Sequence, residues 1–420
     1  MRATLFSILL CGLVTYSFAQ DYTTTLDSFY VPTPEYTNSL NLDSLHFPCA
    51  ITQPTAGNKF PILILVHGTS VLDMDANSTK DYKDNVGTNF RKAQTRMFFE
   101  IADSLSRNGI MVLRYDKRSF TVNCIEKPEC WFVDTISPHD YMRDIHHAVD
   151  FVKTLSNVDT CNIFLAGHSQ GGSFVSTVGN ERKDVRGILN MAGTALPIDS
   201  VSIKQFETIN SDPVGANILR DQFDSLRNGT WPMTQTLYGN HFSPRFWLDW
   251  ITHTDSAIIV QQNSTKPTAF MNGTADRFVP PNIHYQAWVD HVNRPNATFK
   301  LFDDIDHSFG TEYDSTMSPE VLQFMISWIH ENTQNCGIVG FEEQTPPHPT
   351  LSLYPNPTTE KLTIISTQTN GTHCQLIDNQ GEILRSIPIE NSSTKLDISD
   401  LKNGIYFITC GAVLSKFIKN

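Results

Sequence analysis

Charge is scarce in this sequence, and positive charge especially so. Only 18% of the 420 residues are charged, and 31 lysines and arginines against 44 aspartates and glutamates give a net charge of −13. No segment is rich in lysine and arginine, whereas binding a polyanion requires a basic surface. We therefore expect no nucleic acid among the partners. The hydrophobic content of 40% is too high for a disordered chain and indicates a globular protein.

Long apolar runs are missing beyond the first twenty residues. No later segment reaches the roughly 18 apolar residues that a membrane-spanning helix needs, so we expect no transmembrane segment. At the start, Arg2 precedes an apolar run over residues 5–14, and Ser17-Phe18-Ala19 places small residues around a cleavage site before Gln20. This pattern predicts a secretory signal peptide over residues 1–19.

Cysteine is also sparse, since seven of the eight remain once the signal peptide is removed. An odd number leaves at least one thiol without a partner inside the chain, although export to an oxidising compartment permits disulfides. Cys124 and Cys130 flank a short segment that contains Pro128, which favours a local bridge between them. Cys161 precedes an apolar run, and we expect it to be a buried thiol that packs as a small hydrophobic residue.

What the sequence does have is a regular alternation of short apolar segments and amphipathic segments between residues 60 and 335. The predicted strands span residues 61–66, 111–115, 162–166, 187–191, 268–271 and 299–302. The predicted helices span residues 90–106, 141–155 and 319–331. The strands lack polar alternation, which is typical of a sheet covered on both faces. The alternation of strands and helices predicts an α/β fold with a mostly parallel sheet.

Residues 200–256 interrupt this alternation with a segment far longer than an ordinary connection. We interpret the segment as a helical lid inserted over one end of the sheet. Its aromatic residues include Phe242, Phe246, Trp247 and Trp250. They could line an acyl pocket, but we favour a role in packing the insertion onto the sheet.

The composition changes after residue 335. Residues 341–350 are rich in proline and poor in apolar residues, which is typical of a linker. From Leu351 onward, short strand-like segments alternate with Asn-Pro and Asn-Gly turns, and no helical period appears. We therefore expect a large domain over residues 20–337 with its lid at about 200–256, a linker over 338–350, and a small all-β, sandwich-like domain over 351–420.

The segment Gly167-His168-Ser169-Gln170-Gly171 matches the pattern G-x-S-x-G, which is weak by itself but lies in a specific context. A predicted strand ends directly before it, and Gly171-Gly172 opens the next amphipathic segment. A nucleophilic serine on such a strand-turn-helix adopts a strained backbone conformation that small neighbours permit. We therefore predict that Ser169 is a nucleophile.

A serine hydroxyl needs a base, and that base must be held by a third group. In the fold that carries this turn, the acid and then the histidine follow the serine along the chain. Asp276 and His307 each follow a predicted strand, so both should lie at the carboxyl edge of the sheet near Ser169. We predict that His307 is the base and that Asp276 orients it. The rivals to Asp276 are Asp303, Asp304 and Asp306.

Negative charge that develops on a substrate oxygen requires backbone N–H donors where it forms. We expect one donor of this oxyanion hole to be the amide of Gln170, directly after the nucleophile. The second should come from the loop after the strand at 61–66, where His67-Gly68 turns the chain, and we assign it to Thr69.

Together these motifs resemble the serine carboxylesterase group of the α/β-hydrolase superfamily. The resemblance covers most of residues 30–335 and rests on His67-Gly68-Thr69, the segment RYDKR at 114–118, GHSQGG at 167–172, AGTALP at 192–197, Asp276 and His307. It implies the α/β-hydrolase fold and hydrolysis of an ester that is a small molecule or is linked to a glycan. It implies no cofactor.

The small domain resembles the C-terminal sorting domain of the type IX (Por) secretion system. The resemblance rests on Tyr354-Pro355-Asn356-Pro357, on LDISDL at 396–401, on KNGIYF at 402–407 and on KFIK at 416–419. It implies that the type IX machinery acts on residues 351–420 and exports the protein through the periplasm of a Gram-negative bacterium to the cell surface or the medium. A carbohydrate-binding or spacer domain is the alternative.

One acidic loop has the spacing of a calcium site. Its candidate ligands are Asp73, Asp75, Asn77, Asp81 and Asp84. Ser78 stands where the turn glycine of such a loop belongs, and Asp84 replaces the bidentate glutamate. We therefore expect no metal ion there.

The sequence thus predicts a secreted serine hydrolase, and it favours a carboxylesterase. A peptidase or a thioesterase is the alternative within enzymes, because the same triad serves several leaving groups. A non-catalytic surface binding protein is the alternative from another class, and a full set of triad residues disfavours it.

Overall fold

The computed structural model describes residues 21–32, 44–77, 82–83, 89–91, 95–124, 126–127, 130, 136–311, 316–335, 351–354, 356–366, 372–378, 382–389, 393–410 and 413–419. These residues fall into two compact units, one within Met1–Asn335 and the other within Cys336–Asn420. The predicted signal peptide lies outside the described residues, as does the predicted linker at 338–350. Among the described residues, no helix is both long enough and apolar enough to cross a membrane.

The large unit is built on an eight-stranded sheet in the order β1-β2-β6-β3-β7-β8-β9-β10. Its strands are β1 (Tyr22–Pro32), β2 (Ser44–Pro54), β3 (Phe60–Val66), β6 (Met111–Tyr115), β7 (Val158–His168), β8 (Val185–Met191), β9 (Thr268–Gly273) and β10 (Ala297–Phe302). Neighbouring strands pair in parallel throughout the series β6, β3, β7, β8, β9 and β10. These are the six strands predicted from the sequence. The hairpin β1–β2 adds two antiparallel strands that the sequence analysis missed.

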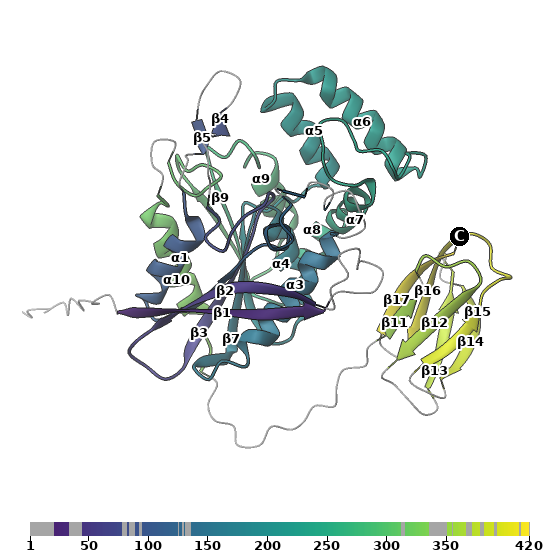
Figure 1. Cartoon of the computed structure of the whole chain (residues 1–420), viewed down its shortest axis with the longest axis horizontal. Coiled ribbons are helices and arrows are strands. Elements are labelled where there is room, and N and C mark those ends of the chain that lie inside the picture. The colour runs from purple at the N-terminus through teal and green to yellow at the C-terminus, as the bar shows by residue number, and fades with distance from the viewer. Residues whose placement is uncertain are drawn as a thin grey trace, which may run out of the picture. The chain divides into compact units, whose positions relative to one another are not determined.

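Helices cover both faces of this sheet, with α1 and α10 on one side and α3 and α4 on the other (Figure 1). The helices outside the insertion are α1 (Met97–Ser106), α2 (Arg118–Thr121), α3 (Pro138–Val152), α4 (Gln170–Glu181), α9 (His284–His291) and α10 (Pro319–Asn332). Along β3, Ile62 and Ile64 pack into the core on the α3 and α4 side. Leu63 and Leu65 pack into the core on the α1 and α10 side. Because both faces of β3 are buried, its sequence is an unbroken apolar run. The mostly parallel sheet with helices on both faces confirms the predicted α/β-hydrolase architecture.

The predicted helix at 90–106 begins too early. Residues Asn89–Arg91 form β5, which pairs with β4 (Tyr82–Lys83), and α1 begins only at Met97. An isolated antiparallel bridge joins Asn77 to Arg96, the residue directly before α1. Pairing of residues 89–91 and of Arg96 with earlier residues of the same loop therefore overrides the local helical pattern at these positions.

The insertion between β8 and β9 is helical and comprises α5 (Ile198–Thr208), α6 (Pro213–Arg227), α7 (Pro244–Thr254) and α8 (Ala257–Gln262). Phe246, Trp247 and Trp250 of α7 are buried. The Phe242 ring stacks on Phe246 at 4.3 Å, and the rings of Trp247 and Trp250 stack at 5.5 Å. These aromatic residues therefore pack against one another within the insertion.

The small unit is all β and contains two antiparallel sheets. One sheet has the order β11-β12-β15 and the other β14-β13-β16-β17. The strands are β11 (Leu351–Tyr354), β12 (Lys361–Ser366), β13 (Thr372–Ile377), β14 (Ile383–Ile389), β15 (Ser393–Asp397), β16 (Gly404–Cys410) and β17 (Val413–Lys419). Leu362, Leu376, Ile408 and Phe417 are among the residues of its core. A disulfide joins Cys374 and Cys410, which face each other on β13 and β16.

The cysteines of the large unit differ in part from the expectation. Cys124 and Cys130 form the predicted local disulfide. The prediction for Cys161 is wrong, because this residue is exposed and disulfide-bonded. It lies at an irregularity in the pairing of β7 with β3 and two residues before the first β7 residue that pairs with β8, so the apolar run that follows does not bury it. Cys49 is buried and carries a free thiol.

Candidate active site

Ser169 occupies a sharp turn between β7 and α4. Its backbone has φ 53° and ψ −116°, a conformation that non-glycine residues rarely adopt. A Cβ atom on Gly167 would lie 2.1 Å from the Gly171 carbonyl oxygen, and one on Gly171 would lie 2.4 Å from the Val66 carbonyl oxygen. The Ser169 amide donates to the Met191 carbonyl at 2.8 Å. The glycines of the motif therefore allow the turn to pack against β3, and the turn presents the serine at the carboxyl edge of the sheet.

His307 follows β10, and Asp276 follows β9, the neighbouring strand in the sheet. The two side chains meet, because His307 Nδ1 donates to Asp276 Oδ2 at 2.8 Å. The other carboxylate oxygen of Asp276 accepts from the amides of Phe278 and Val279, each at 2.9 Å. A carboxylate accepts from Nδ1 when that nitrogen carries the ring proton, and Nε2 of His307 is the basic nitrogen in this tautomer.

The three rival aspartates lie elsewhere. Asp303 and Asp304 are exposed. Asp306 is buried, and its Oδ1 accepts from the amides of Ser308 and Gly310. Burial raises the pKa of Asp306 to about 6. Among the described residues, only Asp276 pairs with the His307 ring.

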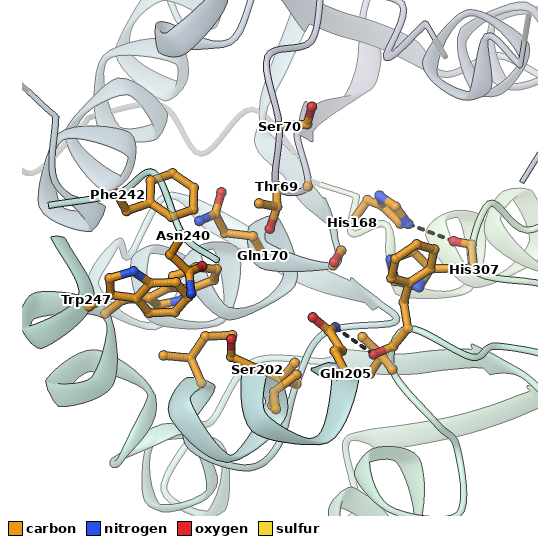
Figure 2. A pocket seen from close by; sticks show the side chains of 18 of the residues that line it. Thr69, Ser70, His168, Gln170, Ser202, Gln205, Asn240, Phe242, Trp247 and His307 are labelled. Atoms are coloured by element: carbon orange, nitrogen blue, oxygen red, sulfur yellow. Dashed lines mark hydrogen bonds between the residues drawn. The ribbon is translucent and has the colours of Figure 1, made fainter. Parts of the chain in front are cut away.

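His168 is a residue of the site that the sequence analysis did not assign. Its Nε2 donates to the backbone carbonyl of His307 at 2.8 Å (Figure 2). The two imidazole rings lie 4.7 Å apart. His168 therefore ties the loop that carries His307 to the turn that carries Ser169, and its position directly before the serine was the available signal.

Ser169 and His307 line one cavity of about 340 Å³, together with Thr69 and Gln170. Figure 2 shows Phe242 and Trp247 on one side of this cavity and His168 and His307 on the other. Among the described residues, no hydrogen bond joins the Ser169 hydroxyl to the His307 ring. Such catalytic hydrogen bonds are often long before substrate binds and shorten in the complex.

The amides of Thr69 and Gln170 are the two predicted donors of the oxyanion hole. Gln170 is the first residue of α4, where amides lack a partner within the helix. In the described part of the chain, neither the Gln170 amide nor the Thr69 amide has a hydrogen-bond partner. Both residues line the cavity beside Ser169.

The walls of the cavity are apolar and aromatic, with uncharged polar groups between them. The aromatic residues that line it are Phe206, Phe242, Trp247, Trp250 and Phe278. The polar residues from the insertion are Ser202, Gln205, Asn210 and Asn240. No lysine, arginine, aspartate or glutamate is among the described residues that line it. The insertion aromatics thus pack the lid and also border the cavity.

The acidic loop at 73–84 uses its carboxylates within the protein. Asp75 pairs with Arg96 and with Arg114. Asp73 accepts from the amides of Asp75 and Asn77 at 3.1 Å each. Asp81 and Asp84 lie outside the described residues. In the parts of the chain that the structure describes, no cluster of three acidic, histidine or cysteine side chains could hold a metal ion.

Comparison with known proteins shows several similarities. The chain is 27% identical over 264 residues to Esterase EstD of Thermotoga maritima, across 62% of this chain and 57% of that protein. It thus spans little more than half the length of this curated relative. Among solved structures, Est1E from Butyrivibrio proteoclasticus is similar with a TM-score of 0.43, at 15% identity, over 72% of this chain and 99% of that chain. The α/β hydrolase GrgF from Penicillium sp. sh18 has a TM-score of 0.47, at 15% identity, over 74% of this chain and 99% of that chain.

Two family models match separate parts of the chain. Residues 352–420 match the model described as "Secretion system C-terminal sorting domain", so the resemblance of the small unit to a sorting domain is confirmed, and type IX secretion is implied. Residues 92–314, more than half of the 420 residues, match the model described as "Serine aminopeptidase, S33". The large unit is therefore a hydrolase domain, and the chain belongs to the Serine aminopeptidase, S33 family.

Proposed function

We propose that this protein is a secreted serine carboxylesterase that works through an acyl-enzyme. Ser169 Oγ attacks the ester carbonyl while His307 Nε2 takes its proton, and Asp276 stabilises the imidazolium. The amides of Thr69 and Gln170 bind the oxyanion. His307 then protonates the departing alcohol, and water repeats the sequence to release the acid. The observation that carries the proposal is the His307–Asp276 pair on a cavity shared with the strained Ser169.

The lining of the cavity favours an ester over a peptide with a free amino terminus. An aminopeptidase must bind an ammonium group close to the scissile bond, and a buried ammonium needs a carboxylate partner. The described lining residues include no carboxylate, and their aromatic and uncharged polar groups suit a neutral acyl group. The peptidase that the family description names is therefore the second candidate. A thioesterase shares the triad and differs only in the leaving group.

A panel of acyl substrates tests this choice. We expect p-nitrophenyl esters of neutral acids to be hydrolysed with a kcat/KM at least about 100-fold above that of the matched aminoacyl esters and arylamides, because several kcal/mol are lost when an ammonium is buried without a counter-charge. Initial rates across graded acyl lengths, with thioester counterparts, measure the preference. Faster turnover of aminoacyl arylamides than of neutral esters would identify a peptidase instead.

A covalent probe, used together with this substrate panel, distinguishes an enzyme from a protein that only binds. A fluorophosphonate probe should label the protein at Ser169, and peptide mass mapping should find the adduct there. A non-catalytic binding protein would remain unlabelled and would hydrolyse none of the substrates.

We further propose that residues 351–420 act as a secretion address and not as part of the catalyst. The large unit has its own hydrophobic cores. A chain that ends at Gly340 should therefore keep its Tm and its kcat/KM within about two-fold, since a domain with its own core folds alone. In the native host, the same truncation should leave active enzyme in the periplasm.

The mass of the exported protein checks this proposal. The full-length precursor should mature by cleavage within residues 338–350, so the protein recovered from the cell surface or the medium should lack the small unit. A terminus at Asn420 on most exported molecules, or normal export of the truncated chain, would assign another role to the small unit, such as carbohydrate binding.

A further inference from the structure

Lys117 is a buried lysine beneath the candidate oxyanion hole. It follows β6, and only 3% of its surface is exposed. Its ammonium donates to the backbone carbonyl of Gly68 and, at 2.9 Å, to Oε1 of Gln170. The ammonium also lies over the Tyr141 ring, 4.8 Å from its centroid. Lys117 thus contacts both segments whose amides are proposed to bind the oxyanion.

This ammonium has no carboxylate partner among the described residues. Asp144, which lines the same small pocket as Lys117, is bound by Arg118. Asp116, the preceding residue, accepts from the Met74 amide at 2.8 Å. Burial lowers the pKa of Lys117 to about 7, because it disfavours the charged form. A buried ammonium without a carboxylate is costly for folding, so its presence beside a candidate active site indicates a functional reason.

The geometry of the peptide bond connects Lys117 to the cavity. In a trans peptide the carbonyl oxygen and the amide hydrogen point in opposite directions. Lys117 holds the Gly68 carbonyl, so the amide of Thr69, which belongs to the same peptide unit, is directed away from Lys117. Gly68 also packs closely on the nucleophile turn, since a Cβ atom there would lie 3.2 Å from the Ser169 Cβ atom. This close packing therefore restricts the orientation of the Gly68–Thr69 peptide.

We propose that Lys117 is a positioning residue of the oxyanion hole. Its ammonium fixes the Gly68–Thr69 peptide with the Thr69 amide toward the substrate oxygen, and it holds the side chain of Gln170 beside the second donor. This proposal rests on the function proposed above. It adds a role for a residue that touches neither the substrate nor the reacting atoms.

The test compares Lys117→Met with the wild-type enzyme. Methionine keeps most of the side-chain volume and removes the ammonium. We expect kcat to fall on the order of 100-fold with KM within about three-fold, because loss or misplacement of one oxyanion donor reduces mainly the rate of the chemical step. A trifluoromethyl ketone that forms a hemiketal with Ser169 should bind more weakly by a similar factor, whereas affinity for the product acid should change little.

A matched control separates this role from a general effect of removing a lysine. Lys266 also donates to a backbone carbonyl, that of Val185, but lies before β9 at the opposite end of the strand from Asp276. Lys266→Met should leave kcat and ketone affinity unchanged. Rates are expressed per active site titrated with fluorophosphonate, so partial misfolding does not count as loss of catalysis. Lys117→Gln, which keeps a side-chain donor, should retain more activity than Lys117→Met.

Wild-type kcat and ketone affinity in both folded Lys117 variants would overturn the proposal, as would a loss that disappears on normalisation to active sites. The proposed esterase function fails by a different result, namely wild-type protein that hydrolyses no neutral ester. In that case the Lys117 comparison is made with the thioester or amide that the protein does hydrolyse, because every acyl transfer at Ser169 passes through the same oxyanion.

Discussion

Replacing Ser169 with alanine is expected to lower kcat for ester hydrolysis by a factor on the order of 10⁴ or more. The alanine variant cannot form the acyl-enzyme, and only substrate binding and the oxyanion donors would remain to accelerate attack by water. Fold should be preserved, since alanine is smaller and has the same difficulty as serine with a φ of 53°. Steady-state kinetics together with circular dichroism and Tm measure the two quantities.

A second serine of the same cavity provides the control. Ser202 lies on α5 and lines the cavity, but it belongs to the insertion and not to the turn after β7. Ser202→Ala should change kcat by less than about three-fold, because its hydroxyl has no proposed role in the reaction. Retention of activity in a folded Ser169→Ala variant, or fluorophosphonate labelling at Ser202, would refute the assignment of the nucleophile.

Replacing Asp276 with asparagine is expected to lower kcat by about 10⁴, the size of the effect known for this change in a Ser-His-Asp protease. The asparagine amide would donate to His307 Nδ1 and so favour the tautomer that carries its proton on Nε2, which cannot accept the Ser169 proton. The backbone donors Phe278 and Val279 still find an acceptor in the asparagine oxygen, so the loop should keep its shape. Kinetics with a neutral p-nitrophenyl ester measure the loss.

The three other aspartates supply graded controls for this experiment. Asp303→Asn and Asp304→Asn change exposed residues and should leave kcat within about three-fold. Asp306→Asn removes a charge that organises the turn at Ser308 and Gly310, so we expect a lower Tm and a smaller loss of kcat than for Asp276→Asn. The assignment of the acid is wrong if one of these three variants loses more kcat than Asp276→Asn.

Local patterns in the sequence were sufficient for the six parallel strands of the large unit, the turn at Ser169 and the small domain. The strands that form the parallel part of the sheet are short apolar runs, and such runs report burial on both faces without knowledge of their neighbours. The pattern around Ser169 predicts a turn because Gly167 and Gly171 are the residues that this turn requires. Cys124 and Cys130 are close along the chain, so their bridge is also a local property.

Contacts between distant segments were decided only by the tertiary structure. Lys117 appeared in the sequence as one basic residue of RYDKR, and nothing local shows that its ammonium reaches the loop at Gly68 and the turn at Gln170. The contact of His168 with the His307 carbonyl joins residues 139 positions apart. Cys161 looked like a core residue because the apolar run follows it, but its exposure depends on how β3 and β8 pair with this end of β7.

The choice among the four aspartates shows the same division. Sequence order placed Asp276 after one strand and Asp303, Asp304 and Asp306 after the next, and all four satisfied the requirement for an acid near the carboxyl edge of the sheet. Only the packing of β9 beside β10 brings the Asp276 carboxylate to His307 Nδ1 and turns the others away. Periodicity and turn chemistry act over a few residues and can be read from the chain, whereas the direction of a side chain in a loop depends on the elements packed around it.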